Sequence, residues 1–246
     1  MAIRTFKRIE KKMLIDESLV PQIIQELSLY MNPDSYNVGG KPYEISNLYF
    51  DNDGDEIIRH SISKPVFKQK LRIRSYGVPK SDDERVFIEL KKKFKGTVTK
   101  RRATLRYGDA LNYINNGTVP QKLSYMDSQV MREVDDFVRL TGCYPKIYIS
   151  YMRYAFFGKD DKSFRVTFDC DIISRREDLS LSAGRFGEPI FPKGKVLLEV
   201  KFSESVPLWF AQLMSKYGVS FHSNSKYGTE FKSYIYDKTL YPTLHF

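Results

Sequence analysis

Pairs of charged residues at strand spacing are the feature of this sequence that could support chemistry. Four short segments each place two charged side chains two positions apart, with mainly apolar residues around them. These pairs are Glu10 and Lys12, Arg72 and Arg74, Glu89 and Lys91, and Glu199 and Lys201. In a β-strand, residues i and i+2 point to the same face, so each pair projects both of its charges to one side.

Several such strands in one sheet would gather cations, with a few carboxylates, on a single surface. Charges gathered in this way repel one another unless an anion, together with a metal ion, lies between them. Taken singly, each Glu-x-Lys pair is typical of a solvated strand face with ion pairs to its neighbours. Because the pattern recurs over several strands, it favours a protein that binds a chain of phosphates.

The composition agrees with an anionic partner. The chain has 246 residues, of which 41% are hydrophobic and 14% aromatic, as in a folded globular protein with a sizeable core. Its formal net charge of +10 indicates a polyanion such as nucleic acid, anionic lipid, nucleotide or polyphosphate. The charge alone does not choose among these partners.

Several protein classes lack support in the sequence. Cys143 and Cys170 have no metal-ligand spacing, and we expect both to be reduced thiols. His60, His222 and His245 are scattered, and nothing resembles a nucleophile–histidine–acid triad. The segment MAIRTFKRIEKKM lacks the apolar stretch of a signal peptide, and no segment reaches about 18 uninterrupted apolar residues. We therefore predict a soluble, cytoplasmic protein without a membrane span.

Periodicity predicts the elements that must position the charged pairs. Strands are predicted over 6–15, 43–50, 67–76, 85–94, 95–106, 146–157, 163–172 and 195–203. Helices are predicted over 18–31 with Ser18 as N-cap, over 107–117 and 125–141, after Ser205, and over 226–240. No convincing linker occurs, so we expect a single domain over 1–246. About eight strands with a few helices indicate an antiparallel barrel or a strongly curved sheet.

The predicted strand over 163–172 shows the two faces clearly. One face carries Phe164, Val166, Phe168, Cys170 and Ile172, and the other carries Arg165, Thr167, Asp169 and Asp171. A charged face of this kind could point to water or into a polar tunnel, and the pattern alone leaves both open.

A nucleic-acid partner is the less favoured interpretation. The run from Lys91 to Lys95 and the stretch from Lys100 to Arg102 could form a basic patch. The aromatic residues nearby, Phe87 and Phe94, are too few for a base-stacking platform. Neither a GxxxxGK[ST] phosphate loop nor a GxGxxG motif occurs. A nucleic-acid partner is therefore not favoured, and an enzyme of this sequence would act through charge and a metal ion.

Eight segments in order give the sequence a family resemblance. They are RIEKKMLI, YEISNLYFD, KLRIRSYG, VFIELKKKFKGTVTKRR, YISYMRYAFF, RVTFDCDI, LLEVKF and SNSKY, and they span roughly residues 5–235. The chain resembles the polyphosphate polymerase domain of the vacuolar transporter chaperone (VTC) type, within the CYTH or triphosphate tunnel metalloenzyme superfamily. It looks like a stand-alone bacterial member.

The resemblance implies an α+β, mainly β, fold: an eight-stranded antiparallel β-barrel tunnel with several flanking helices. It also implies a catalytic group that binds and polarises a triphosphate, and this group is Arg72, Arg74, Lys91 and Arg153. Further phosphate-binding residues are expected at Lys12, Arg102, Lys201 and Lys226, and at Arg165 from its strand face. Mn²⁺ or Mg²⁺ is expected at Glu199, with Glu10 as a second ligand.

The implied activity is ATP-dependent polyphosphate synthesis, in which the γ-phosphoryl group passes to a growing polyphosphate chain. The wider superfamily often begins E-x-E-x-K, whereas this chain has Arg8 at the first position. Loss of that carboxylate disfavours an activated water and favours a phosphate acceptor. ATP and polyphosphate are thus the expected partners, and a membrane partner protein leaves no trace in the sequence.

Two alternatives remain open from the sequence. The first is a metal-dependent triphosphatase or tripolyphosphatase that uses the same tunnel with water as acceptor. The second is a non-catalytic module that binds polyphosphate or nucleic acid. Glu199 argues against the second alternative, because a pure anion binder gains little from a carboxylate in its lumen.

Overall fold

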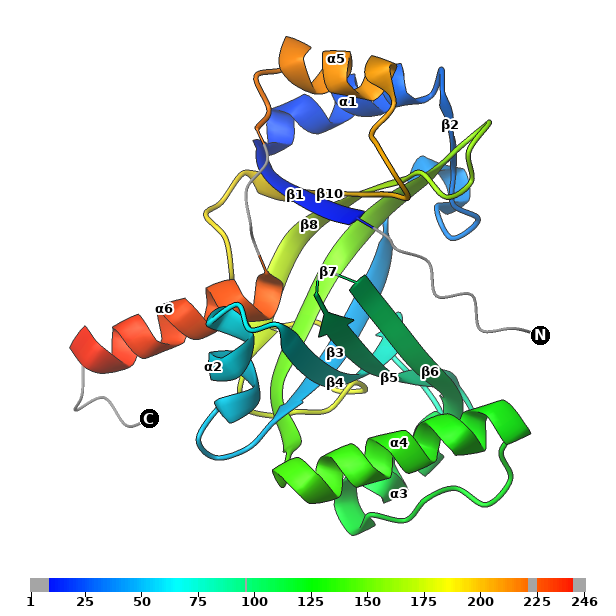
Figure 1. The fold of residues 1–246 in the computed structure, drawn as a ribbon, viewed down its shortest axis with the longest axis vertical. Helices are drawn as coiled ribbons and strands as arrows, with labels where there is room; N and C mark the ends of the chain where they lie inside the picture. The colour runs from blue at the N-terminus through cyan, green and yellow to red at the C-terminus, as the bar shows by residue number, and fades with distance from the viewer. Residues whose placement is uncertain (1–8, 96, 221–224, 241–246) are drawn as a thin grey trace.

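The computed structural model describes residues 9–95, 97–220 and 225–240. Its central feature is a strongly curved antiparallel sheet of ten strands (Figure 1). The main path through the sheet is β1 (Ile9–Asp16), β10 (Lys195–Phe202), β8 (Arg165–Arg175), β7 (Tyr144–Gly158), β3 (Tyr43–Asp51), β4 (Phe67–Tyr76), β5 (Arg85–Phe94) and β6 (Thr97–Arg106). Two short strands lie off this path: β2 (Met31–Pro33) pairs with β7, and β9 (Glu188–Pro189) pairs with β8.

The predicted eight antiparallel strands and tunnel-like curvature are confirmed, but the sheet does not close into a barrel. Among the described residues, the terminal strands β1 and β6 form no ladder with each other. An ion pair crosses the concave side instead, between the Lys91 amine of β5 and the Glu10 carboxylate of β1 at 3.5 Å. The fold is therefore a curved, tunnel-like sheet in which a side-chain ion pair links the edge strand β1 to β5, the strand next to the other edge.

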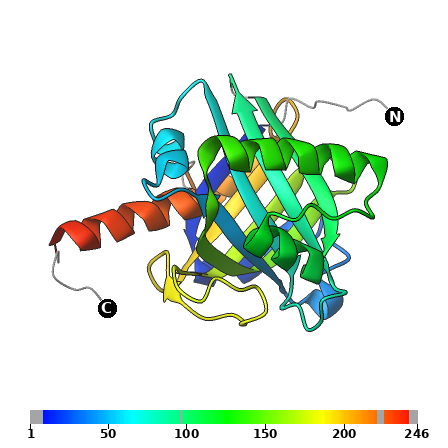
Figure 2. The same cartoon turned by 90° about the horizontal axis from the view of Figure 1, so that it is seen from below.

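Two helical layers cover the convex face of the sheet. The helices α1 (Val20–Leu27) and α5 (Leu208–Lys216) pack on β1, β8 and β10. The helices α3 (Tyr107–Asn116) and α4 (Tyr125–Thr141) pack on β4, β5 and β6, and Figure 2 shows α4 lying across these strands. Apolar residues on the outer face of each strand meet apolar helical faces, which leaves the inner face to the charged residues.

Local signals predicted most helix ends. The helices α3 and α4 end at Gly117 and Gly142, whose positive φ angles of 67° and 63° fit a glycine C-cap. Ser18 was wrong as an N-cap, because it lies in a short 3-10 helix (Glu17–Leu19) and α1 begins at Val20. A second 3-10 helix spans Val38–Gly40. None of the helices in the described ranges combines the length and apolarity needed to cross a bilayer.

The helices α2 (Glu56–Ile62) and α6 (Lys226–Leu240) cover one end of the concave face. There the sheet presents apolar residues such as Ile147, Ile149 and Leu197, which share a core cluster with Tyr227 and Phe231 of α6. The concave face is thus divided into an apolar end beneath α6 and a charged remainder. Periodicity predicts α6 but not α2, which is only 7 residues long.

The buried carboxylate of Asp51 joins these two helices to the sheet. One of its oxygens accepts a hydrogen bond from the Ile57 backbone N–H at 2.9 Å. The other accepts one from the Ile58 N–H at 2.9 Å and one from the Tyr227 hydroxyl at 2.9 Å. The hydrogen bond from the Tyr227 hydroxyl to Asp51 holds the first turn of α6 in place, directly after Lys226.

We predict that Tyr227→Phe lowers the free energy of unfolding by about 1.5 kcal/mol, because it removes one hydrogen bond to a buried charged group. Urea denaturation followed by circular dichroism would measure the change. Tyr236→Phe is the matched control, since Tyr236 lies on the same helix and is 64% exposed. Equal stability of the two variants would show that the Asp51–Tyr227 bond does not stabilise α6.

Candidate active site

The registers of the strands place the predicted charged residues on one concave face. Directly paired residues of antiparallel strands point to the same side of a sheet. The register aligns Lys12 with Glu199, Arg72 with Glu89, Glu89 with Arg102, and Arg153 with Asp169. The charged face of the strand over 163–172, left open by its pattern, therefore points into the concavity at Arg165, Thr167 and Asp169.

Glu89 of β5 binds three cations from the two neighbouring strands, β4 and β6. Its carboxylate is 1% exposed and accepts bonds from Arg72 Nε at 2.8 Å, Lys100 Nζ at 2.9 Å and Arg102 Nε at 2.6 Å. Burial alone would raise the pKa of Glu89, but the surrounding cations outweigh burial and hold this pKa far below its usual range. Glu89 is therefore a fixed anion that holds the arginine side chains in position.

Arg74 differs from its neighbours, because its contacts are neutral. The guanidinium is 6% exposed and donates to Asn47 Oδ1 at 2.8 Å and to the Tyr151 hydroxyl at 3.0 Å. Among the described residues it has no carboxylate within ion-pair distance. A buried cation without a directly paired anion is unfavourable, and a bound phosphate would remove this penalty.

Asp169 brings together two cations that are distant in the sequence. Its buried carboxylate accepts a bidentate contact from Arg153 at 2.6 and 2.7 Å and a further bond from the Lys226 amine. Burial would raise the pKa of Asp169, but Arg153 and Lys226 lower it to about 2. Asp169 is not among the site residues predicted from the sequence, although the strand pattern places it on a charged face.

A second group of charges lies between β1 and β10. Lys12 pairs with Glu10 at 2.8 Å, Lys201 pairs with Glu199 at 2.9 Å, and Arg153 lies 3.7 Å from Glu199. Burial tends to lower the pKa of Lys12, but the two glutamates outweigh this effect and raise it. Burial tends to raise the pKa of Glu199, yet the pKa is lowered, chiefly by Lys201 and Lys12. Both carboxylates therefore stay ionised.

Glu10 and Glu199 suit a divalent cation that takes most of its ligands from phosphate and water. Glu10 and Glu199 lie close enough for their charges to interact. The described residues hold no cluster of three or more carboxylate, histidine or cysteine ligands. Thr167 is paired in register with Glu199, and its buried hydroxyl has no hydrogen-bond partner among the described residues. Mg²⁺-like ions are typically held by one or two carboxylates together with phosphate and water oxygens, so these residues fit such an ion.

The remaining predicted residues lie toward the edges of the concave face. Arg165 pairs with Asp34 at 3.3 Å, and its guanidinium lies over the Phe157 ring. Lys91 of β5 reaches Glu10 of β1 across the concave side, and its side chain is 41% exposed. The structure thus brings all predicted site residues onto one face, whereas Arg8 lies outside the described residues.

Lys70 extends the cation row on β4 but is not among the site residues predicted from the sequence. Lys70 is paired in register with Lys91, and none of the described carboxylates lies within ion-pair distance of its amine. Its spacing from Arg72 is the same as that of Arg72 from Arg74, so the pattern used for the arginines could have identified it. Lys70, Lys100, Glu89 and Asp169 complete the site.

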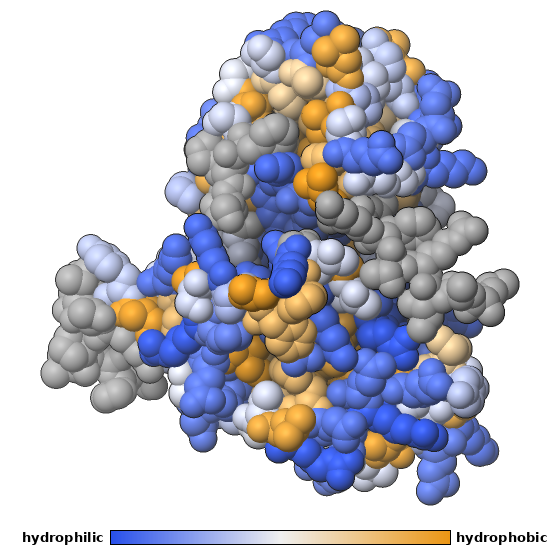
Figure 3. Space-filling model, in the orientation of Figure 1, coloured by the Kyte–Doolittle hydropathy of each residue, from blue (hydrophilic) through white to orange (hydrophobic). Residues whose placement is uncertain are grey.

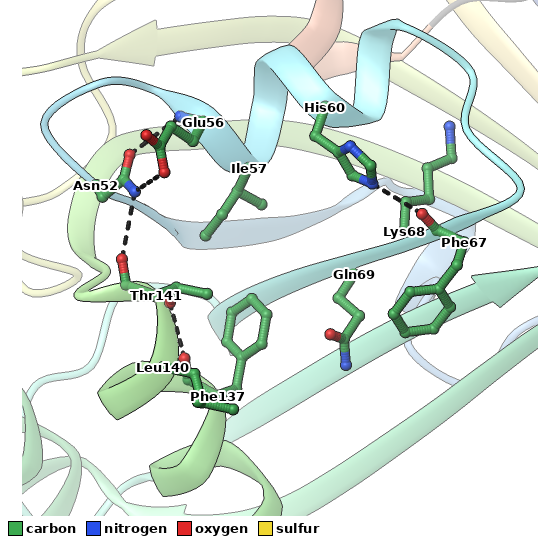
Figure 4. A pocket seen from close by; sticks show the side chains of 10 residues that line it. All are labelled: Asn52, Glu56, Ile57, His60, Phe67, Lys68, Gln69, Phe137, Leu140 and Thr141. Atoms are coloured by element: carbon green, nitrogen blue, oxygen red, sulfur yellow. Dashed lines mark hydrogen bonds between the residues drawn. The ribbon is translucent and has the colours of Figure 1, made fainter.

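One surface cavity lies outside this site. It encloses about 280 Å³ between α2, β4 and the end of α4 (Figure 4). Its polar groups bond to one another, as in the contacts of His60 with the Phe67 carbonyl and of Asn52 with the Thr141 carbonyl. In Figure 3, by contrast, hydrophilic side chains border the recess between the upper and lower helical layers. The charged concave face is therefore the candidate active site.

We predict that Glu89→Gln lowers the free energy of unfolding by about 3 kcal/mol, because three cations then lose a buried anionic partner. Inorganic tripolyphosphate should stabilise this variant more than the parent protein, since it can replace the missing charge. Urea denaturation with and without the anion would measure both effects. Glu133→Gln, which removes a half-exposed partner of Lys92 and Arg101, should cost only about 0.5 kcal/mol. A similar loss in both variants would contradict the role of Glu89.

Comparisons with known proteins agree with this architecture. A crystal structure of a candidate adenylate cyclase from Bacillus halodurans shares the fold, with a TM-score of 0.55 and 16% identity over 89% of this chain and 93% of that one. Weaker likenesses are a Pyrococcus horikoshii protein (TM-score 0.44, 11% identity, 92% and 99% covered) and the Mimivirus capping-enzyme triphosphatase (0.35, 10%, 86% and 87%). No curated protein matched. The family model of the VTC domain matches residues 7–235, so the chain belongs to the VTC domain family.

Proposed function

We propose that this chain is an ATP-dependent polyphosphate polymerase. The observation that carries the proposal is Arg74, a buried cation held by neutral groups in the middle of a cationic face. On this face cations outnumber carboxylates, so the site is completed by a polyanion of several charges. Membership of the VTC domain family supports a condensed phosphate as that polyanion.

The proposed reaction transfers one phosphoryl group without a covalent enzyme intermediate. An oxygen of the terminal phosphate of the chain attacks the γ-phosphorus of ATP. The bond between this phosphorus and the bridging oxygen breaks, ADP leaves with that oxygen, and the chain gains one phosphate. Such transfers depend mainly on alignment and on neutralising charge that spreads over the phosphoryl oxygens.

Arginine and lysine side chains supply that neutralisation. Arg74 and Arg72 hold the triphosphate through planar guanidinium groups, which suit bidentate phosphate contacts. Arg153 and Lys91 contribute charge from either side of the concavity. Because Glu89 already holds Arg72, the geometry of these donors is fixed before the substrate binds.

Glu199 and Glu10 are the proposed ligands of Mn²⁺ or Mg²⁺. When bound, such an ion would neutralise phosphate charge beside the two carboxylates. Lys12 pairs directly with Glu10, and Lys201 pairs directly with Glu199. Lys226 is linked to Glu199 through Asp169 and Arg153. These amines are suited to guide the phosphate chain that accepts the phosphoryl group.

The state of the two glutamates favours transfer to phosphate over hydrolysis. A hydrolase needs a carboxylate that can take a proton from water. Glu10 is paired with Lys12 and Lys91, and Glu199 with Lys201, and both pKa values are lowered despite burial. Such carboxylates are weak bases, whereas a terminal phosphate oxygen is already anionic and needs no base.

The proposal predicts that the purified protein forms chains when it is incubated with ATP and Mn²⁺. Products would be separated on a gel stained for polyphosphate, and free phosphate would be assayed in parallel. A ladder of chains is expected. Free phosphate without a ladder would identify a triphosphatase instead, and the absence of both products would leave a binding module.

Arg74→Ala should reduce synthesis by about a hundredfold or more, which corresponds to the loss of one preorganised electrostatic contact. Glu199→Ala should have a similar effect, since it removes a proposed metal ligand. Circular dichroism would verify that both variants stay folded. Arg139→Ala, a change to a surface arginine that is 72% exposed on α4, should retain full activity. Normal synthesis by a folded Arg74→Ala protein would refute the proposed site.

Lys70 should link phosphate binding to proton uptake. Burial and the charges of Lys68, Lys12 and Lys91 lower the pKa of Lys70 from 10.5 to about 7, so its amine is mostly neutral at pH 8. Bound phosphate would favour the charged form and raise this pKa. Binding of inorganic tripolyphosphate at pH 8 should therefore take up protons, which calorimetry in two buffers of different ionisation enthalpy would measure.

Lys70→Met should reduce this uptake at pH 8 but hardly at pH 6, where Lys70 is already charged before binding. Protonation of Lys70 should strengthen phosphate binding, but it destabilises the free folded protein. Because the folded pKa lies below the unfolded value, the charge destabilises the free protein increasingly as pH falls from about 10 to about 7. Lys70→Met should thus raise the Tm of the free protein at pH 7, and an unchanged proton uptake at pH 8 would exclude Lys70 from the phosphate site.

A further inference from the structure

Four aromatic rings from separate segments meet at the end of the concave face that lies away from α6. Tyr36 stacks on Tyr76 with ring centroids 5.1 Å apart and an interplanar angle of 20°. Tyr43 lies 5.3 Å from Tyr36, and Phe87 meets Tyr76 edge-on at 5.6 Å. We call Tyr36, Tyr43, Tyr76 and Phe87 the aromatic platform.

The platform adjoins the cations of the proposed active site. Phe87 is paired in register with Arg74, and the Arg102 guanidinium lies 4.6 Å from the centroid of the Phe87 ring. Burial would raise the pKa of Tyr76, but Arg74 and Arg102, which also contact its hydroxyl, lower it. The rings and the two guanidinium groups thus form one continuous surface.

The segment that presents Tyr36 is firmly attached to β7. The Asn37 amide donates to the Arg153 carbonyl at 3.1 Å and accepts from the Ala155 N–H at 3.0 Å. The Asp34 N–H donates to the Ala155 carbonyl at 2.8 Å. Tyr36 itself remains 53% exposed, so its ring is fixed in place without being buried. An exposed, positioned ring beside cations is the arrangement that binds a flat aromatic ligand attached to phosphate.

We propose that the aromatic platform binds the nucleobase of the donor nucleotide, with the triphosphate extending to Arg102, Arg74 and Arg72. This inference rests on the proposed function and adds a base-binding site to it. Stacking accepts every base, because each base has a π-face. We therefore expect ATP and GTP to bind with similar affinity and larger purines to bind better than pyrimidines.

The order of side chains along β4 agrees with this placement. Its concave positions, read from one end of the strand to the other, are Lys68, Lys70, Arg72, Arg74 and Tyr76. The aromatic ring at one end would face the base, and the guanidinium groups in the middle would face the triphosphate. The amines at the other end would face the phosphate chain. The acceptor chain would accordingly approach from the lysine side, nearer to α6.

Tyr36→Ala tests the platform without removing a cation. Calorimetric titrations would compare a non-hydrolysable ATP analogue with inorganic tripolyphosphate, which has no base, in the presence of Mn²⁺. The variant should bind the ATP analogue about tenfold more weakly and tripolyphosphate with unchanged affinity. Tyr36→Trp should retain the affinity for the analogue. Tyr125→Ala, a change to a 73% exposed tyrosine on α4, is the control and should change neither affinity.

The outcomes separate this inference from the proposed function. If Tyr36→Ala leaves both affinities unchanged, or weakens both equally, the platform does not bind the base, while the phosphate site still stands. If the parent protein binds neither ligand, the proposed function fails and the base site fails with it. A loss confined to the nucleotide would establish the platform.

Discussion

The structure depends on one electrostatic constraint: many cations share the inner face of a single curved sheet. Buried carboxylates make this arrangement possible. Glu89 holds Arg72, Lys100 and Arg102, while Asp169 holds Arg153 and Lys226. Each carboxylate stabilises its cations as a unit, so removing one member leaves charges that the protein interior does not solvate. The anions are too few to neutralise the face, and this leaves it poised to bind phosphate.

The fold surrounds this face with apolar packing on three sides. The pairs α1 with α5 and α3 with α4 cover the convex side, and α2 with α6 cover the apolar end of the concave side. The sheet edges β1 and β6 remain unpaired with each other in the described part of the chain, and an ion pair crosses the concave side from β1 to β5. A cationic concavity of this kind is stable because the hydrophobic stabilisation lies elsewhere in the molecule.

The chemical character of the site changes from one end of the concave face to the other. Along β4 the inner positions change from amine to guanidinium to aromatic ring, and β5 runs antiparallel with Lys93, Lys91, Glu89 and Phe87 beside them. Different chemical groups therefore follow one another along the concave face, as a nucleotide and a phosphate chain would require. This order gives a physical basis for donor and acceptor occupying different ends of one continuous site.

The sequence by itself determined the local elements and the kind of charge they carry. Alternation predicted the strands and placed Arg72, Arg74 and Glu199 on charged faces, and Gly117 and Gly142 marked helix ends, because these signals are local in the chain. Only the tertiary structure decided which strand neighbours which. It broke the alternation of β8 at Asp171, where φ is positive (47°), so that Ile172 joins the inner apolar cluster. It also selected Asp169 as the partner of Lys226 and brought Tyr36, Tyr43 and Tyr76 together with Phe87, a group that the sequence pattern does not predict. Register between strands distant in sequence sets such contacts, and local periodicity carries no information about it.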